Sequence, residues 1–231
     1  MLRAYLFLAA VVAPALLAQD SVRPHFVRAS GEAVISVKPD RAEVTIGVTS
    51  SAPSAAAASA HNATESTQVL NSIRQALGSG GEVKTSGYSL SPQYEYSNGH
   101  PPRLTGYQAS NTVTVTIDQL SLLGKVIDSA TQTGATNVNG ISFTLKDPSA
   151  VRQKVLTEAA KKARANAEAL ANALGVTVTG LLEAEPAEVP AIRPLARTIP
   201  SVAMMAEKVA TPVESGDVDV NATVTVTLQV R

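Results

Sequence analysis

The residues of this chain that are best suited to chemistry are its histidines and serines, but their spacing matches no catalytic or metal-binding motif. His25, His61 and His100 each lack a second histidine or a carboxylate at a spacing such as H-E-x-x-H, so we expect all three at the surface. Residues 87–91 lack the second glycine of a G-x-S-x-G nucleophile elbow. A Ser-His-Asp triad brought together by the fold is the remaining route to catalysis.

Cysteine usage removes a further class of chemistry. The chain contains no cysteine, so thiol peroxidase chemistry is impossible and no disulfide contributes to stability. We therefore expect a protein that is not an enzyme, with no catalytic, cofactor-binding or metal-binding residues and no cofactor.

Residues 1–18 predict a cleaved signal peptide. Arg3 precedes an apolar run over residues 6–17, and Ala18 is a suitable cleavage point. An uncleaved anchor is the alternative, but this run is shorter than the roughly twenty residues that span a bilayer. We expect the mature protein, which starts with a lead-in over residues 19–26, to be periplasmic or secreted and to contain no transmembrane helix.

The charge balance of the mature chain argues against polyanionic partners. Removal of Arg3 leaves 19 − 1 = 18 basic side chains against 19 acidic ones. A nearly neutral chain has no general attraction for nucleic acid, so we expect no nucleic-acid partner.

Residues 147–174 predict the longest helix, around which the rest of the chain is organised. Asp147 is a suitable N-cap, Pro148 suits the first helical position, and Gly175 ends the segment. Apolar residues three or four apart form a stripe that is rich in alanine. We expect this helix to lie flat on a β-sheet, through the stripe Val151, Val155, Ala159, Ala163, Ala167, Leu170 and Leu174.

Period-two alternation of apolar and polar residues predicts the strands. Residues 29–37 and 42–49 alternate on either side of Pro39-Asp40, which predicts a first hairpin. Residues 82–96 and 107–117 predict a second, longer hairpin. The strictest alternation, over residues 218–230, predicts a strand with one buried face.

Two further helices complete the predicted order of elements. Residues 53–77 form one, and a shorter one follows Asp118, which we expect to be its N-cap. The order is β-β-α-β-β-α-β-α-β-loop-β. It predicts the α+β class, with mixed, mostly antiparallel sheets that amphipathic helices cover on one face.

The stretch from residue 186 to residue 216 differs in composition from the rest of the chain. Its prolines exclude a long regular element, yet it is too apolar for an ordinary solvated linker. Met204 and Met205 suit adaptable contacts, so contact with another subunit and packing over the sheet are both open interpretations.

All four tyrosines of the mature chain, Tyr88, Tyr94, Tyr96 and Tyr107, fall on the second predicted hairpin. Cross-strand packing is one interpretation, because aromatic pairs stabilise hairpins. A contact patch for a partner subunit or a small ligand is the other, because tyrosine is enriched at interfaces.

These elements, in this order, resemble the SIMPL-domain family, which is named for a signalling molecule that associates with a pelle-like kinase. The resemblance extends from about residue 27 to residue 231, and no single motif is highly specific. One departure is Glu214-Ser215-Gly216, where the family more often has Pro-Gly before the last strand. The matching segments are Ser30-Gly31-Glu32, Val37-Lys38-Pro39-Asp40-Arg41-Ala42, Leu104-Thr105-Gly106-Tyr107-Gln108-Ala109, Thr133-Gly134-Ala135, Asn139-Gly140-Ile141-Ser142-Phe143, Lys161-Lys162-Ala163-Arg164-Ala165-Asn166-Ala167 and Met204-Met205.

The resemblance implies an exported, non-enzymatic protein that forms homo-oligomers. Bacterial members of the family are periplasmic or outer-membrane-associated, and several are surface antigens or oxidative-stress-defence proteins. The hypothesis is therefore a protein that acts through contacts with itself and with a protein partner that the sequence does not identify. The alternative is a small-molecule-binding or enzymatic protein with its site at the tyrosine-rich hairpin.

Overall fold

The alternating C-terminal segment forms the central strand of the first of two four-stranded sheets. It is β8 (Val218–Val230) in the computed structural model, which describes residues 25–187, 191–194 and 215–231. The predicted signal peptide, Met204 and Met205 lie outside the described residues. All pairings of β8 are antiparallel, and its partners are β1 (Phe26–Val37) on one side and β6 (Val178–Pro186) and β7 (Ala191–Pro194) on the other.

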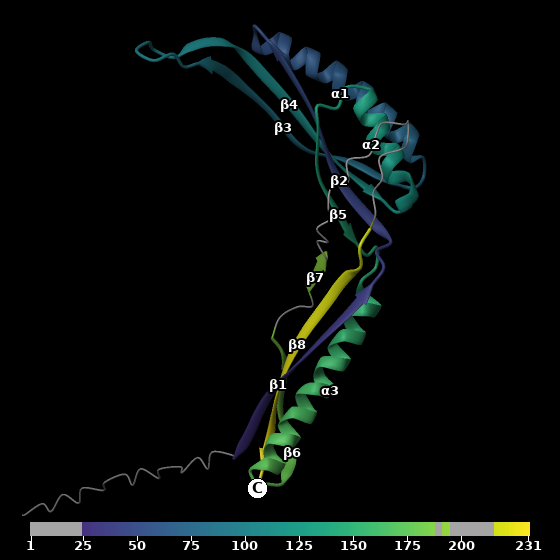
Figure 1. Cartoon of the computed structure of the whole chain (residues 1–231), viewed down its shortest axis with the longest axis vertical. Coiled ribbons are helices and arrows are strands. Elements are labelled where there is room, and N and C mark those ends of the chain that lie inside the picture. Colours follow the sequence, from purple (N-terminus) through teal and green to yellow (C-terminus); the bar gives the residue numbers. More distant parts are fainter. Residues whose placement is uncertain (1–24, 188–190, 195–214) are drawn as a thin grey trace, which may run out of the picture.

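One face of the first sheet is covered by α3 (Ser149–Ala173), as the alanine stripe predicts (Figure 1). The helix begins one residue later than predicted, with Pro148 at the N-cap position, although Asp147 Oδ1 accepts a hydrogen bond from Ser149 N at 2.9 Å. Gly175, at a φ of 70°, follows the end of the helix. The helix lies so close to β1 that a Cβ atom at Gly31 would be 2.1 Å from Ala163 N. The side chains fully buried against the sheet are Val155, Ala159, Ala163, Ala167 and Ala171.

The prediction for the last turns of this helix is wrong. Leu170 is 41% exposed and Leu174 is 63% exposed, whereas Ala171 is buried. Buried residues four apart advance by about 40° around the helix at each step, because a turn contains 3.6 residues. The buried face therefore moves around α3 along its length and reaches Ala171 in place of the two leucines.

The second sheet has the order β3-β4-β2-β5 and is antiparallel throughout. One of its faces packs against two helices and buries branched side chains such as Ile46, Ile73 and Val126. Its strands are β3 (Gly81–Glu95), β4 (Arg103–Ile117), β2 (Arg41–Ala52) and β5 (Asn137–Thr144), and its helices are α1 (Ala55–Leu77) and α2 (Leu123–Gln132), the latter preceded by the 3-10 turn η1 (Leu120–Leu122).

The second predicted hairpin is confirmed and the first is wrong. β3 and β4 pair along their length, but β1 pairs with β8, and β2 pairs with β4 and β5. Pro39-Asp40 takes the chain from one sheet into the other, so β1 and β2 follow one another along the molecule (Figure 1). Alternation identifies both strands correctly, whereas the turn residues between them do not determine which strands pair.

Asp118 does not cap the short helix that follows it. The 3-10 turn begins after Gln119 and α2 begins after Leu122, and neither residue makes a capping side-chain hydrogen bond. The Asp118 carboxylate instead forms ion pairs with Arg41 and Lys146. The sequence therefore locates the helix correctly but assigns the wrong role to the residue before it.

The chain is an α+β protein, and in its described part each sheet has helices on one face only. Figure 1 shows a curved molecule with α1, α2 and α3 along the outer side of the curve and the β3–β4 hairpin reaching away at one end. β7 is a strand of four residues within the proline-rich stretch, most of which lies outside the described residues, so the absence of a long element there stays a prediction.

Candidate interaction surface

The β3–β4 hairpin carries all four predicted tyrosines, but it does not bring them into one cluster. In the register of the two strands, Tyr88 is opposite Asn111, Tyr94 is opposite Leu104, and Tyr107 is opposite Pro92. No tyrosine in this register faces another tyrosine. The cross-strand partners of Tyr94 and Tyr107 are Leu104 and Pro92, so cross-strand packing of these tyrosines involves other residue types.

Two of the tyrosines are directed toward α1. The Tyr88 hydroxyl hydrogen-bonds to Ser59 Oγ at 3.0 Å, although its side chain is still largely exposed. Tyr107 is half-buried and packs against Ala52, Ala58 and Ala109. Tyr107 is thus a packing residue, and Tyr88 joins the hairpin to the helix at its edge.

The other two tyrosines are open to solvent. Tyr94 is 47% exposed beside Leu104, which is 45% exposed, and Tyr96 at the start of the turn is 78% exposed. Leu90 is also 40% exposed, on the same strand. A group of exposed large apolar side chains indicates an interaction site, whereas a single exposed leucine does not.

Sequence reasoning missed Leu90 and Leu104 as members of this surface. Each stands among serine, threonine, glycine and proline, so neither belongs to a strong apolar stripe. A count of large apolar residues over the whole hairpin, in place of tyrosines alone, would have found them. We define the hairpin surface as the exposed residues Tyr88, Leu90, Tyr94, Tyr96 and Leu104.

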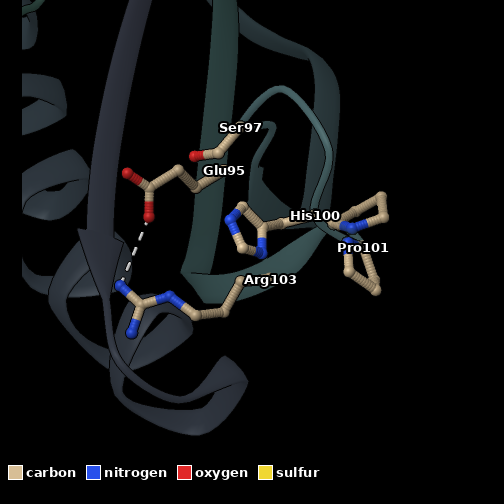
Figure 2. A pocket seen from close by; sticks show the side chains of 6 residues that line it. Glu95, Ser97, His100, Pro101 and Arg103 are labelled. Carbon is tan, nitrogen blue, oxygen red and sulfur yellow. Dashed lines mark hydrogen bonds and ion pairs between the residues drawn. The ribbon is translucent and has the colours of Figure 1, made fainter.

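The turn of the hairpin encloses an open hollow of about 470 Å³, shown in Figure 2. Glu95 and Arg103 on its wall pair with each other, at 3.3 Å between Oε2 and Nη2. His100 donates its backbone N–H to Ser97 O at 3.1 Å, and among the described residues its ring makes no hydrogen bond to Ser97 or Glu95. General acid–base catalysis needs such a hydrogen bond or a group poised to form one, so this arrangement gives no support to a triad.

The strongest electrostatic cluster lies at the other end of the second sheet. Asp118 Oδ1 accepts from Arg41 Nε at 2.7 Å, and Asp118 Oδ2 accepts from Lys146 Nζ at 2.7 Å. The hydrogen bond from Arg41, followed by the one from Lys146, lowers the pKa of Asp118 to about 2. A carboxylate with so low a pKa is a poor general base at neutral pH. Its role is to tie the ends of β2 and β4 to the segment after β5.

A second polar feature, which sequence reasoning missed, is buried under α1. Asn62 is fully buried and donates from Nδ2 to Val48 O at 2.8 Å and to Ala109 O at 3.2 Å. It joins the helix to β2 and β4, beside the buried hydroxyl groups of Ser50 and Ser66. The periodicity that predicts an apolar helix face counts hydrophobic residues only, so it does not include an asparagine.

The histidines are placed as predicted, since His25, His61 and His100 are all exposed. Across residues 25–187, 191–194 and 215–231, no three histidine, aspartate or glutamate side chains gather where they could hold a metal ion. Over the same residues, no helix has the length and apolar character needed to cross a membrane.

Comparison with known proteins gives matches over nearly all of the described fold. The model of the SIMPL family, described as a protein of unknown function (DUF541), matches residues 27–228, which run from β1 to β8. The chain is 27% identical over 219 residues to the 26 kDa periplasmic immunogenic protein of Brucella melitensis, covering 92% of this chain and 88% of that protein. It is 30% identical over 149 residues to the uncharacterized protein YggE of Escherichia coli K12, covering 64% of this chain and 60% of that protein.

Proposed function

The chain belongs to the SIMPL family, and we propose that it is an exported, non-enzymatic protein that acts through contacts with other proteins and with copies of itself. The observation that carries this proposal is the hairpin surface. It places five large side chains in solvent on a hairpin that projects at one end of the molecule (Figure 1). A soluble protein gains stability when such side chains are covered by a partner.

The ion pairs of the acidic side chains support a role in protein contacts over a role in catalysis. Glu95 is paired with Arg103 at the hairpin turn, and Asp118 is paired with Arg41 and Lys146 at the far end of the sheet. Acid–base catalysis needs groups free to exchange protons with a substrate, and the carboxylates of Glu95 and Asp118 are already engaged with basic side chains.

Location in the periplasm or outside the cell is part of the same proposal. Residues 1–18 have the pattern of a signal peptide, and the relative from Brucella melitensis is named a periplasmic immunogenic protein. The family resemblance adds outer-membrane association and a role in envelope or oxidative-stress defence. Any such role would be indirect with respect to thiol chemistry, because the chain has no cysteine.

The proposal can be tested with two matched pairs of exposed leucines in the mature protein, residues 19–231. Leu90→Ser with Leu104→Ser removes apolar side chains from the hairpin, whereas Leu170→Ser with Leu174→Ser removes similarly exposed ones from α3. We expect only the hairpin pair to reduce the assembly mass measured by light scattering and the capture of proteins from the exported fraction. Equal behaviour of both pairs and the wild type would contradict the proposal.

The hollow at the hairpin turn favours a second candidate, a small-molecule site. It is open, and its charged groups are paired, so a ligand would have to compete with the bond between Glu95 and Arg103. Arg103→Ala, in the wall of the hollow, and Tyr94→Ala, on the exposed hairpin surface, distinguish the two candidates. Loss of a bound metabolite by native mass spectrometry with the assembly intact would favour the ligand, and loss of assembly would favour protein contact.

A further inference from the structure

β3 is the outermost strand of the second sheet, and it is also the most exposed strand of that sheet. β4 lies on one side of it, and in the described part of the chain no strand lies on the other. Its 15 residues extend over about 50 Å at the usual rise of a strand. A row of backbone N–H and C=O groups along this outer edge is therefore available to another strand.

This edge lacks the charged residues with which proteins usually guard an exposed strand. Between Lys84 and Glu95 there is no charged residue for ten positions, 85–94. The register with β4 is irregular between Thr85 and Gly87, and again between Gln93 and Tyr94. Between these two irregularities, residues 87–91 form a regular and uncharged strand segment.

The other outer strands are less suitable for pairing. β1 carries Arg28 and Glu32, and β6 carries Glu183 and Glu185 together with irregular register. β5 has only eight residues and contacts β7 at its side. Among the described strands, β3 therefore offers the longest edge without charge.

Residues 87–91 are complementary to themselves when two copies run antiparallel. With Ser89 opposite Ser89 of a second copy, Tyr88 of each copy faces Leu90 of the other. Aromatic–aliphatic pairs across antiparallel strands are stabilising, and the two-fold axis forms this pair twice. No charged residue lies between the two irregularities, so like charges do not meet within the regular segment.

We propose that β3 pairs antiparallel with β3 of a second copy of this chain, around a two-fold axis at Ser89, to make one continuous sheet from two. This inference rests on the proposed function, since it names a partner and the contact for the hairpin surface. It accounts for Tyr88 and Leu90, the two exposed large side chains of the regular segment, because each would be covered by the other copy. Main-chain hydrogen bonds would give the affinity, and the Tyr88–Leu90 pairs would set the register.

A cysteine-free chain makes the register directly testable. Opposite residues in antiparallel strands have Cα atoms about 4.5 to 5.5 Å apart, which is within the range that a disulfide bridges. Under mild oxidation of the mature protein, Ser89→Cys should form a disulfide-linked dimer quickly. Ser142→Cys, on the outer strand β5, is the matched control and should stay monomeric on a non-reducing gel.

Charge substitution at the same residue tests the contact without a covalent link. Ser89→Lys sets two ammonium groups opposite each other, so it should abolish the dimer in analytical ultracentrifugation. Mixing Ser89→Lys with Ser89→Asp should restore it as a heterodimer, whereas Ser142→Lys should leave wild-type association unchanged. Circular dichroism must show native signal for every variant before its mass is interpreted.

The outcomes separate this inference from the proposed function. If Ser89→Lys keeps the wild-type mass and Ser89→Cys forms no disulfide, while the Leu90 and Leu104 pair of substitutions still reduces assembly, the β3 contact is wrong and the proposed function stands. A wild-type protein that is monomeric at all concentrations and captures no partner would overturn both.

Discussion

Long strands are buried in the first sheet, where α3 covers them, and exposed in the β3–β4 hairpin. In the first sheet, β1 and β8 lie under a helix whose alanine stripe is fully buried, and Gly31 leaves no room between β1 and α3. The hairpin pairs along its length with two irregularities of register, yet many of its side chains, and nearly all of those on β3, remain in solvent. A strand can therefore pair regularly although only part of it is buried. The exposed part of the β3–β4 hairpin is where we expect contact with a partner.

The largest effect should come from filling the space between β1 and α3. Gly31→Ala would place a Cβ atom 2.1 Å from Ala163 N and 2.5 Å from Ala159 O, both backbone atoms that cannot rotate away. The helix would have to move off the sheet, and we expect a loss of about 3 kcal/mol in the free energy of unfolding. Urea unfolding followed by circular dichroism measures it.

The control for this substitution lies on the hairpin. At Gly87 the nearest atom to an added Cβ is Thr112 Cβ at 3.9 Å, which is ordinary contact. Gly87→Ala should change the free energy of unfolding by less than about 0.5 kcal/mol. Similar losses at both positions would mean that α3 is not packed as closely as the structure shows.

The next effect concerns the layer under α1, where a polar group is buried. Asn62→Ala would leave Val48 O and Ala109 O buried without this donor, which should lower the free energy of unfolding by about 2 kcal/mol. His61→Ala, on the exposed side of the same helix, should change it by less than about 0.5 kcal/mol. A small change at Asn62 would show that water or a rearranged neighbour satisfies these carbonyl groups.

The comparison also shows why some features could be predicted from the sequence and others could not. Alternation and caps are local signals, so residues 218–230 and the helix ended by Gly175 are predicted within a few residues. Strand pairing is not local. Phe26 pairs with Gln229, about two hundred positions away, and nothing in Pro39-Asp40 indicates that β1 leaves its neighbour in sequence for β8.

The candidate surface was predictable in composition but not in arrangement. Four tyrosines on one hairpin indicate the element that carries the exposed surface, but which of them are exposed depends on the register with β4 and on the packing against α1. Tyr107 is half-buried for this reason, while Tyr94 is open. The contribution predicted for Met204 and Met205 remains a prediction, because both lie outside the described residues.

A smaller effect, dependent on pH, should appear where the two sheets meet. The pKa of Asp118 is lowered from 3.8 to about 2 by its hydrogen bonds with Arg41 and Lys146. The carboxylate therefore stabilises the fold above pH 3.8, where it is ionised in both states, and this stabilisation is lost as the pH falls toward 2. Asp118→Asn should be less stable than the wild type at pH 5, and the difference should shrink by pH 2.

Urea midpoints at pH 5, 3.5 and 2 measure this difference. Asp217→Asn, at an exposed aspartate just before β8, is the matched control and should follow the wild type at every pH. A difference for Asp118→Asn that is constant over this range would show that the ion pairs do not form in solution.

The smallest effect on stability should be found on the hairpin surface itself, where two tyrosines of the same element behave differently. Tyr94→Ser removes a side chain that is 47% exposed and belongs to none of the buried clusters, so the free energy of unfolding should change by less than about 0.5 kcal/mol. Tyr107→Ser removes packing against Ala52 and Ala58 and should lower it by about 1 to 2 kcal/mol. Self-association should show the reverse order when measured by light scattering on folded protein, with Tyr94→Ser the more affected. If both substitutions lowered stability equally and left association unchanged, the hairpin would be a structural element like the first sheet, and the distinction between the two regions would fail.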